Sequence, residues 1–284
     1  MLDESLVGHE TTSETGDITA ADVVAFATAI GDPNPAYLDP AHPEAMPVPP
    51  TFVTRFRVPF EEAGLDVAHM QVLHGEQEYI YHRPLRVGDR LTVRHRIAAI
   101  KQSPARAMSI MTIEQLIDGL DGERLGLGTS VVIVRQGSAD ASATSAPGKV
   151  MPAPEGERIP TLTKTVTQAQ INAYANVSQD HNPIHVNPEV ATAVGLGGTI
   201  AHGMLSMGFL GEQLTTWAAS QRGEEGWVRR LRVRFQGMVR PGDTVSCQGA
   251  LGERAGARQP LAVWVDNQRG ERVITGDADV MLGV

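Results

Sequence analysis

The chain of 284 residues repeats part of itself, and this repeat constrains its fold more than any other feature of the sequence. Residues 18–40 read ITAADVVAFATAIGDPNPAYLDP, and residues 166–188 read VTQAQINAYANVSQDHNPIHVNP. Both segments carry a β-branched residue, a threonine, a helical pattern and then Asp-x-Asn-Pro, so that Asp32 matches Asp180. A repeat of this length indicates two copies of one structural unit.

A second match strengthens the argument for duplication. The sequence YHRPLRVGDRLTV at residues 81–93 resembles QGMVRPGDTVSC at residues 236–247, with Gly88-Asp89 opposite Gly242-Asp243. The two matches occur in the same order and at nearly the same spacing, which duplication explains better than chance.

A linker separates the two copies. Residues 136–157 read QGSADASATSAPGKVMPAPEGE, which is rich in Ser, Ala, Pro and Gly and shows no hydrophobic periodicity. We therefore predict an N-terminal domain at 1–136, a linker at 137–157 and a C-terminal domain at 158–284.

Each half shows the same order of elements. Thr19 and Thr167 are placed to cap short helices over 20–30 and 168–177, and the Asp-x-Asn-Pro turn follows each helix. A second helical stretch comes next, longer in the C-terminal half, and then a run of segments with alternating apolar residues. This order predicts an α+β fold of two tandem units, each an antiparallel sheet packed on a buried central helix.

Composition excludes several classes of protein. The net charge of −9 and the pI near 5.5 argue against a nucleic-acid or anionic membrane surface. The single cysteine, Cys247, rules out an intramolecular disulfide and a thiolate metal cage, and we expect it to be a small strand residue. The acidic N-terminus lacks a signal peptide, and the apolar stretch at 200–219 contains His202 and Glu212, so we expect a cytoplasmic protein without a membrane span.

The residues after Asp180 carry a resemblance to a known family. The segment SQDHNPIHVNPEVA followed by GLGGTIAHGMLSMGFLG resembles the MaoC-type (R)-specific enoyl-CoA hydratases and dehydratases, which have the hotdog fold. The family pattern is Asp-x-Asn-Pro-hydrophobic-His and then a glycine-rich approach to a central helix near Ala-His-Gly. The N-terminal half resembles the degenerate hotdog unit of double-hotdog members that carry an N-terminal FAS1-like dehydratase domain.

The resemblance implies reversible hydration of a trans-2-enoyl thioester to an (R)-3-hydroxyacyl thioester, or the reverse dehydration. The substrate is then a coenzyme A or acyl carrier protein thioester, and no further cofactor is expected. This chemistry requires a group that deprotonates water, a proton for C2 and stabilisation of the thioester oxygen. The resemblance assigns the acid–base work to Asp180 and His185, and Asn182 can orient the water. Which group protonates C2 stays open.

A purely structural interpretation competes with this assignment. An isolated D-x-N-P-x-H string is more often an Asx-turn beside a surface histidine, because Asp and Asn favour turns. The Ala-His-Gly sequence downstream favours the chemical interpretation of Asp180 and His185. Gly203 is the candidate oxyanion donor at a helix N-terminus, although helix packing alone would also explain it. His202 and Ser206 are weaker candidates for ligand contact, with capping or packing as the alternative.

A metal site is considered and not predicted. His181 and His185 are four residues apart and His202 could be a third ligand, but Pro183 disfavours a regular helix between the pair. The glutamate that follows the first histidine of a metalloprotease helix is also missing after His181.

The N-terminal half lacks the chemical residues. Tyr37 stands where the other half has His185, and the residues at 48–52 replace Ala-His-Gly. We therefore predict that this half is not catalytic, and the resemblance implies that it instead leaves room for a bulky acyl chain. A set of arginines in the C-terminal half would either meet coenzyme A phosphates or form the solvated face of a strand: Arg230, Arg232, Arg234 and Arg240.

Two other functions remain as alternatives. A hotdog thioesterase is disfavoured because no acidic residue lies near Gly203 on the central helix, Glu212 being more than two turns away. A non-catalytic subunit that binds acyl thioesters would not need the pair of Asp180 and His185. The two fused units would form a monomeric pseudo-dimer, and a further homodimer is possible.

Overall fold

The strands of this protein form one antiparallel sheet in the computed structural model, which describes residues 2–12, 14–39, 43, 46–65, 70–136, 149–221 and 226–283. Part of the expected linker, residues 137–148, lies outside the described residues. In the described chain the sheet has ten strands in the order β1-β3-β4-β5-β2-β7-β10-β9-β8-β6. The strands are β1 (Glu14–Asp17), β2 (Met70–Tyr81), β3 (Arg90–Ser103), β4 (Met108–Gly119), β5 (Arg124–Gln136), β6 (Leu162–Thr165), β7 (Gly226–Phe235), β8 (Thr244–Leu251), β9 (Arg258–Asn267) and β10 (Arg272–Leu282).

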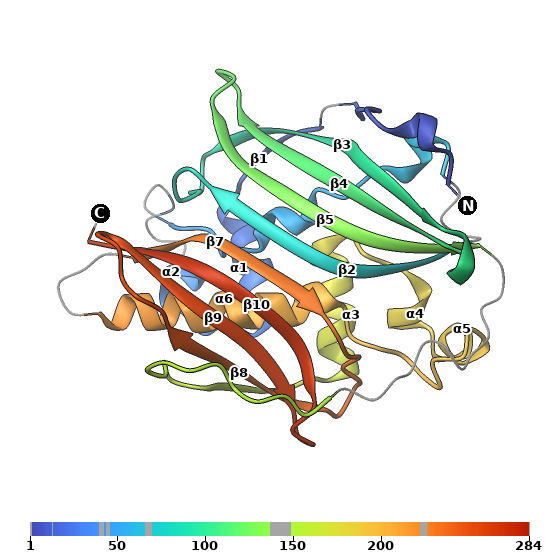
Figure 1. The fold of residues 1–284 in the computed structure, drawn as a ribbon. Coiled ribbons are helices and arrows are strands. Elements are labelled where there is room, and N and C mark those ends of the chain that lie inside the picture. Colours follow the sequence, from blue (N-terminus) through green and yellow to red (C-terminus); the bar gives the residue numbers. More distant parts are fainter. Residues whose placement is uncertain are drawn as a thin grey trace.

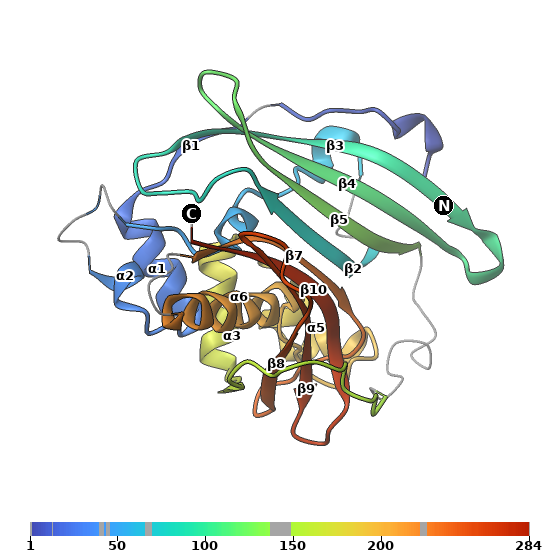
Figure 2. The same ribbon diagram turned by 60° about the vertical axis from the view of Figure 1, so that its left-hand side comes forward.

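The helices gather on one face of this sheet (Figures 1 and 2). The α-helices are α1 (Ala20–Ile30), α2 (Pro35–Leu38), α3 (Gln168–Ser178), α4 (Pro183–Val186), α5 (Pro188–Ala193) and α6 (Gly203–Ser220). Short 3-10 helices are η1 (Glu4–Leu6), η3 (Phe52–Arg55), η4 (Phe60–Ala63) and η6 (Pro104–Arg106). The expected caps are confirmed, because the side chains of Thr19 and Thr167 accept backbone N–H bonds at the starts of α1 and α3.

The two halves meet at the centre of the sheet. β2 of the N-terminal half pairs with β7 of the C-terminal half, with Glu76 opposite Arg234 and Ile80 opposite Arg230 (Figure 1). One hydrophobic core continues from Ile18 in the first half to Leu282 in the second. The two units therefore form a single body with a shared sheet and a shared core.

The second sequence match corresponds to one turn built twice. Gly88 and Gly242 both adopt a φ of 91°, a conformation that favours glycine. The N–H of Gly88 donates to the carbonyl of Ile18 at 2.9 Å, and the N–H of Gly242 donates to the carbonyl of Val166 at 2.7 Å. Identical turns at matching positions support the duplication inferred from the sequence.

α6 is the central helix of the C-terminal half. Most of its apolar side chains are buried, and it packs on β7, β8, β9 and β10. The small residues on its surface let other segments approach: a Cβ at Gly208 would lie 3.2 Å from Ile30, and one at Gly211 would lie 3.7 Å from Pro50. The close approach inferred from these glycines is therefore present.

The N-terminal half departs from the expectation of a central helix in each unit. Its counterpart is reduced to the short 3-10 helices η3 and η4, which lie on either side of Pro59. A proline is tolerated in the first turn of a helix, but inside a helix it removes a hydrogen bond and clashes with the preceding turn, so Pro59 disfavours one continuous helix through this stretch. Aromatic side chains pack around the shortened segment, all of them buried: Phe26, Phe52, Phe56, Tyr79 and Tyr81.

The arginine stripe on β7 belongs to the seam between the halves. Arg232 and Arg234 bind the carboxylate of Glu76, and Arg230 binds Glu78 and the neighbouring Asp277. The more exposed pairs, those of Arg232 and Arg234 with Glu76, contribute at most about 1 kcal/mol each. The solvated-strand interpretation of this stripe therefore fits the structure better than a phosphate site. Arg240 is engaged separately, donating to the carbonyl of Leu196 at 2.7 Å.

Two smaller expectations concern the C-terminal half and the membrane. Cys247 is buried on β8 and faces the core, as expected for a small strand residue.

Among the helices that the structure describes, none combines the length and the apolar character required to span a bilayer.

Candidate active site

The turn after α3 presents Asp180. α3 ends at Ser178, and the next residue, Gln179, takes a left-handed φ of 59° and directs the chain away from the helix axis. The N–H of Asn182 then donates to Asp180 Oδ1 at 3.3 Å, and Asn182 Oδ1 accepts from the N–H of Ile184 at 3.3 Å. Pro183 occupies the first position of α4, where its missing N–H is harmless. Asn182 thus caps α4, and its proposed role in orienting water remains a prediction.

α4 turns His185 inward, where only 8% of its surface is exposed. His185 Nδ1 lies 2.8 Å from the carbonyl oxygen of Ile200. A carbonyl oxygen can only accept, so Nδ1 carries the proton and Nε2 of the neutral ring holds a free lone pair. Gln168 of α3 fixes the surrounding backbone, donating to the His185 carbonyl at 2.9 Å and accepting from the Thr199 hydroxyl at 2.5 Å.

His202, at the start of α6, completes a cluster with Asp180 and His185. Its Nε2 donates to the backbone carbonyl of Asp180 at 2.9 Å, and its ring stacks on His185 with centroids 3.8 Å apart. One side-chain N or O atom from each of the three residues lies within 4.8 Å of the others. Within the described chain, the buried Nδ1 of His202 has no hydrogen-bond partner.

Gly203 begins α6 beside this cluster. The preceding His202 makes no side-chain cap, so the first amides of the helix are not capped by it. A Cβ at Gly203 would lie 2.8 Å from the ring of Phe235, so glycine is required for packing at this point. The packing role is compatible with oxyanion binding, which would use the amide rather than the Cα. Ser206 is buried within the first turn of α6.

The environment sets the charges of the cluster. Burial would raise the pKa of Asp180, but Arg57, His202 and His185 together hold it below its ordinary value. Burial lowers the pKa of His185, although Asp180 and the Ile200 carbonyl act in the opposite direction. Burial and the neighbouring His185 lower the pKa of His202 to about 4. At neutral pH the cluster therefore contains one carboxylate and two neutral imidazoles.

Three further residues around Asp180 were not foreseen from the sequence. Arg57 of the N-terminal half forms an ion pair with Asp180, with Nη1 2.5 Å from Oδ1. The ring of His74 on β2 lies against the ring of Phe235, with centroids 5.1 Å apart. The ring of Tyr174 on α3 lies against that of His202, with centroids 5.2 Å apart. Arg57 and His74 carry no local sequence signal, because their relation to Asp180 arises only when the two halves pack together.

The cluster also has the donor types of a metal site. The trio is Asp180, His185 and His202, whereas His181 of the sequence hypothesis is exposed and outside it. A divalent cation at this position would have to displace the guanidinium of Arg57 from Asp180 or lie beside its positive charge. The arrangement therefore suits an acid–base pair better than a cation site.

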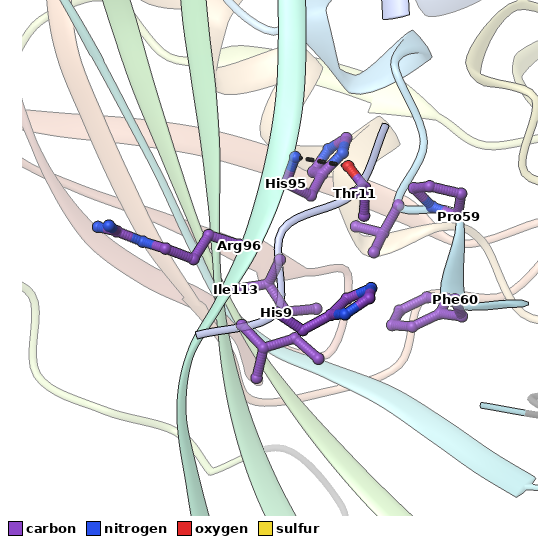
Figure 3. A pocket seen from close by; sticks show the side chains of 9 residues that line it. His9, Thr11, Pro59, Phe60, His95, Arg96 and Ile113 are labelled. Atoms are coloured by element: carbon purple, nitrogen blue, oxygen red, sulfur yellow. Dashed lines mark hydrogen bonds between the residues drawn. The ribbon is translucent and has the colours of Figure 1, made fainter. Parts of the chain in front are cut away.

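A small cavity in the N-terminal half lies apart from this chemistry. Figure 3 shows His9, Thr11, His95 and Phe60 around it, and its volume of about 10 Å³ is room for one water molecule at most. None of the cluster residues lines it. It is too small to bind an acyl chain.

Comparison with known families matches both halves. Residues 150–271 match the family described as MaoC like domain, and residues 5–126 match the family described as FAS1-like, dehydratase domain region. The two matches follow the order of the duplicated units.

Individual proteins and a solved structure are also similar to this chain. A UPF0336 protein of Streptomyces avermitilis is 39% identical over 113 residues, covering 35% of this chain and 74% of that protein. The 3-hydroxyacyl-thioester dehydratase X of Mycobacterium tuberculosis is 29% identical over 208 residues, covering 72% of this chain and 69% of that protein. A solved structure described as a MaoC-like dehydratase superposes with a TM-score of 0.81 at 19% identity, covering 98% of both chains.

Proposed function

Because this chain belongs to the MaoC-like dehydratases that join a FAS1-like dehydratase region to a MaoC like domain in a double hotdog fold, we propose that it is a hydro-lyase. Its reaction is the reversible addition of water to a trans-2-enoyl thioester, giving an (R)-3-hydroxyacyl thioester. The substrate is a coenzyme A or acyl carrier protein thioester, and the reaction needs no further cofactor.

One observation carries the proposal. Asp180, His185 and His202 converge at the start of α6, with the Nε2 lone pair of His185 held free by the bond from Nδ1 to Ile200. A fixed base beside an uncapped helix N-terminus is the pairing that water addition to a thioester requires. A protein that only binds acyl thioesters has no need of a base held in one tautomer.

The reaction proceeds in two proton transfers. His185 Nε2 removes a proton from water as the hydroxyl oxygen bonds to C3, and the C2–C3 double bond electrons move toward the thioester carbonyl. The imidazolium formed is stabilised by the Asp180 carboxylate and then delivers the same proton to C2. Water is thereby added without loss or gain of atoms, and dehydration is the reverse path. In this scheme His185 carries the proton and Asp180 stabilises its charged form.

The backbone N–H of Gly203 donates a hydrogen bond to the thioester oxygen and stabilises the negative charge that develops on it. Helix α6 contributes a partial positive charge at this end, since its first amides point out of the helix. His202 Nδ1, which is buried and unpartnered within the described chain, accepts a hydrogen bond from the attacking water or from the 3-hydroxyl of the product.

Crotonyl-CoA hydration tests the proposal directly. Purified protein is mixed with crotonyl-CoA and with longer and branched enoyl-CoAs, and loss of enoyl absorbance is followed together with release of free thiol. We expect loss of absorbance without thiol release, and formation of the (R)-3-hydroxyacyl product. Thiol release would establish a thioesterase instead. Binding without turnover of any of these substrates would contradict the proposal and favour a binding subunit.

A further inference from the structure

We propose that Arg57, supplied by the N-terminal half, is a positioning residue of the active site that holds the Asp180 carboxylate ionised and oriented toward His185. The inference rests on the proposed function and deepens it. In this proposal the N-terminal half contributes a charged side chain to the active site and does more than shape the space for the substrate.

The ion pair is close and partly shielded. Arg57 Nη1 lies 2.5 Å from Asp180 Oδ1, and the two side chains are 39% and 30% exposed. The same carboxylate oxygen accepts the N–H of Asn182, so its position is fixed from both halves of the molecule. A charge-assisted bond to arginine is directional, and it therefore restrains the plane of the carboxylate as well as its charge.

The backbone before Arg57 is anchored to the sheet. The side-chain amide of Gln115, buried on β4, donates to the carbonyls of Val53 at 3.2 Å and Phe56 at 2.9 Å. After Arg57, Val58 packs against a second hydrophobic cluster under the outer part of the sheet. The guanidinium is thus presented by a segment held on both sides rather than by a free loop.

Arg57 is the positively charged group in the surroundings of Asp180. The groups that bear on its charge come from five segments: Arg57 after η3, His74 on β2, Tyr174 on α3, His185 on α4 and His202 before α6. Burial lowers the pKa of His74 to about 4, as it does that of His202, and burial raises the pKa of Tyr174 above its ordinary value. Of these described groups, Arg57 alone is a cation at neutral pH.

Removing this cation should move the ionisation of Asp180. Burial penalises the carboxylate, so without Arg57 its pKa rises toward the working pH and a larger fraction is protonated. A protonated Asp180 can no longer stabilise the imidazolium of His185. Activity should therefore be lost at the acid end of the pH range first.

The test compares three variants in the full chain. Arg57→Met removes the charge at similar length, and Arg57→Lys keeps the charge without the planar fork. Arg55→Met is the matched control, since Arg55 lies in η3 and pairs at 2.9 Å with Asp22 of α1, away from Asp180. The measurement is kcat/KM for crotonyl-CoA between about pH 5 and pH 9, with a thermal melt of each variant.

We expect the acid limb of the profile to move to higher pH by about one unit in Arg57→Met, because an adjacent opposite charge commonly lowers a carboxyl pKa by about 1–3 units. Arg57→Lys should keep the acid limb close to that of the natural protein. Arg55→Met should leave it unchanged. An unchanged acid limb in Arg57→Met, or an equal displacement in Arg55→Met, would overturn the proposal.

A second readout separates this inference from the proposed function. The Asp180 carboxyl is titrated by carbon-13 NMR in the natural protein and in Arg57→Met, with Arg57→Gln in its place if the methionine variant does not fold. A higher pKa of Asp180 in the variant without the charge supports the role of Arg57 even if no enoyl thioester is turned over. An unchanged pKa of Asp180 in that variant refutes it.

Discussion

The two Asp-x-Asn-Pro turns of this molecule have the same backbone conformation but different side-chain surroundings. In each turn the aspartate accepts an N–H bond from the asparagine, at 2.9 Å for Asp32 and 3.3 Å for Asp180, and the asparagine caps a four-residue helix. The residue before each aspartate is left-handed, Gly31 at a φ of 70° and Gln179 at 59°. Glycine adopts this conformation freely, whereas glutamine does so at a cost of about 1–2 kcal/mol.

The surroundings of the two turns differ. Asp180 is partly exposed and paired with Arg57, whereas Asp32 is 2% exposed and its Oδ2 has no hydrogen-bond partner in the described chain. The nearby cation, Lys164 of β6, binds Glu212 at 2.7 Å and the Gly31 carbonyl at 2.6 Å instead. Burial accordingly raises the pKa of Asp32.

The second difference is the residue five positions on. His185 keeps a free imidazole nitrogen, while Tyr37 is 3% exposed and burial raises its pKa far above the range in which it could exchange a proton. The comparison shows that the turn belongs to the fold. In the proposed mechanism the aspartate of this turn contributes when a cation holds its pKa low and a histidine stands beside it.

The largest expected effect comes from replacing the aspartate, or the residue five positions after it, in each of the two turns. Asp180→Asn and His185→Gln should each lower kcat for crotonyl-CoA hydration by about 10²–10⁴-fold, the usual contribution of general acid–base catalysis. The matched changes Asp32→Asn and Tyr37→Phe should leave kcat within a few-fold of the natural protein.

Steady-state kinetics with thermal melts of all four variants would check this prediction. A large loss of kcat in a well-folded Asp32→Asn variant would end the distinction between a catalytic and a degenerate half.

A smaller effect is expected at the start of α6. Gly203→Ala places a Cβ 2.8 Å from the ring of Phe235, so the helix start or the ring must move. A displacement near 1 Å at a reacting site commonly lowers the rate by about 10²-fold, and we expect a loss of kcat of about that size.

Gly211→Ala on the same helix is the control. Its Cβ would meet Pro50 at an ordinary contact distance of 3.7 Å, and alanine favours a helix interior by up to about 1 kcal/mol. Kinetics and melting temperatures of both variants test this prediction; full activity in Gly203→Ala would show that the site tolerates a Cβ at this position.

The smallest effect concerns the buried carboxyl beside the degenerate turn. Burial raises the pKa of Glu212 to about 7, although Lys164 opposes this. The folded state then binds more protons than the unfolded state above a pH of about 4.5, so this group makes stability fall as pH rises through about 4.5 to 7. Glu212→Gln removes this contribution.

Urea unfolding at about pH 5 and pH 8 measures the difference between the two proteins. The free energy of unfolding should fall more steeply with pH in the natural protein than in Glu212→Gln, by about 2 kcal/mol over this interval. The buried histidines act in the opposite direction, but they are common to both proteins and cancel. Parallel pH dependences would mean that Glu212 is ionised throughout.

Much of the fold was predictable because its signals are local. Thr19 and Thr167 cap helices within a few residues of themselves, and the alternation at 231–235 gives a strand whatever its neighbours are. The central helix of the N-terminal half was the exception. Pro59 lies between η3 and η4, so this proline should have weighed against a continuous helix there despite the argument from duplication.

The candidate site was predictable to the extent that it lies on one short segment. Asp180, Asn182 and His185 fall within one turn, and His202 and Gly203 begin the next long helix. Their roles in catalysis remain predictions. Arg57 and His74 could not be found in this way, since each lies in the other half and meets Asp180 only through the packing of that half.

The sequence by itself determined the duplication, the α+β class and the place where an acid and a histidine come together, because repeats, caps and turns act over a few residues. Only the tertiary structure decided that the pKa of one aspartate is raised and that of the other is lowered. The pKa of a carboxyl depends on burial and on charges within a few ångströms, and those charges come from segments far away in the chain. The same four-residue turn therefore holds a buried, unpaired acid in one half and a paired carboxylate in the other.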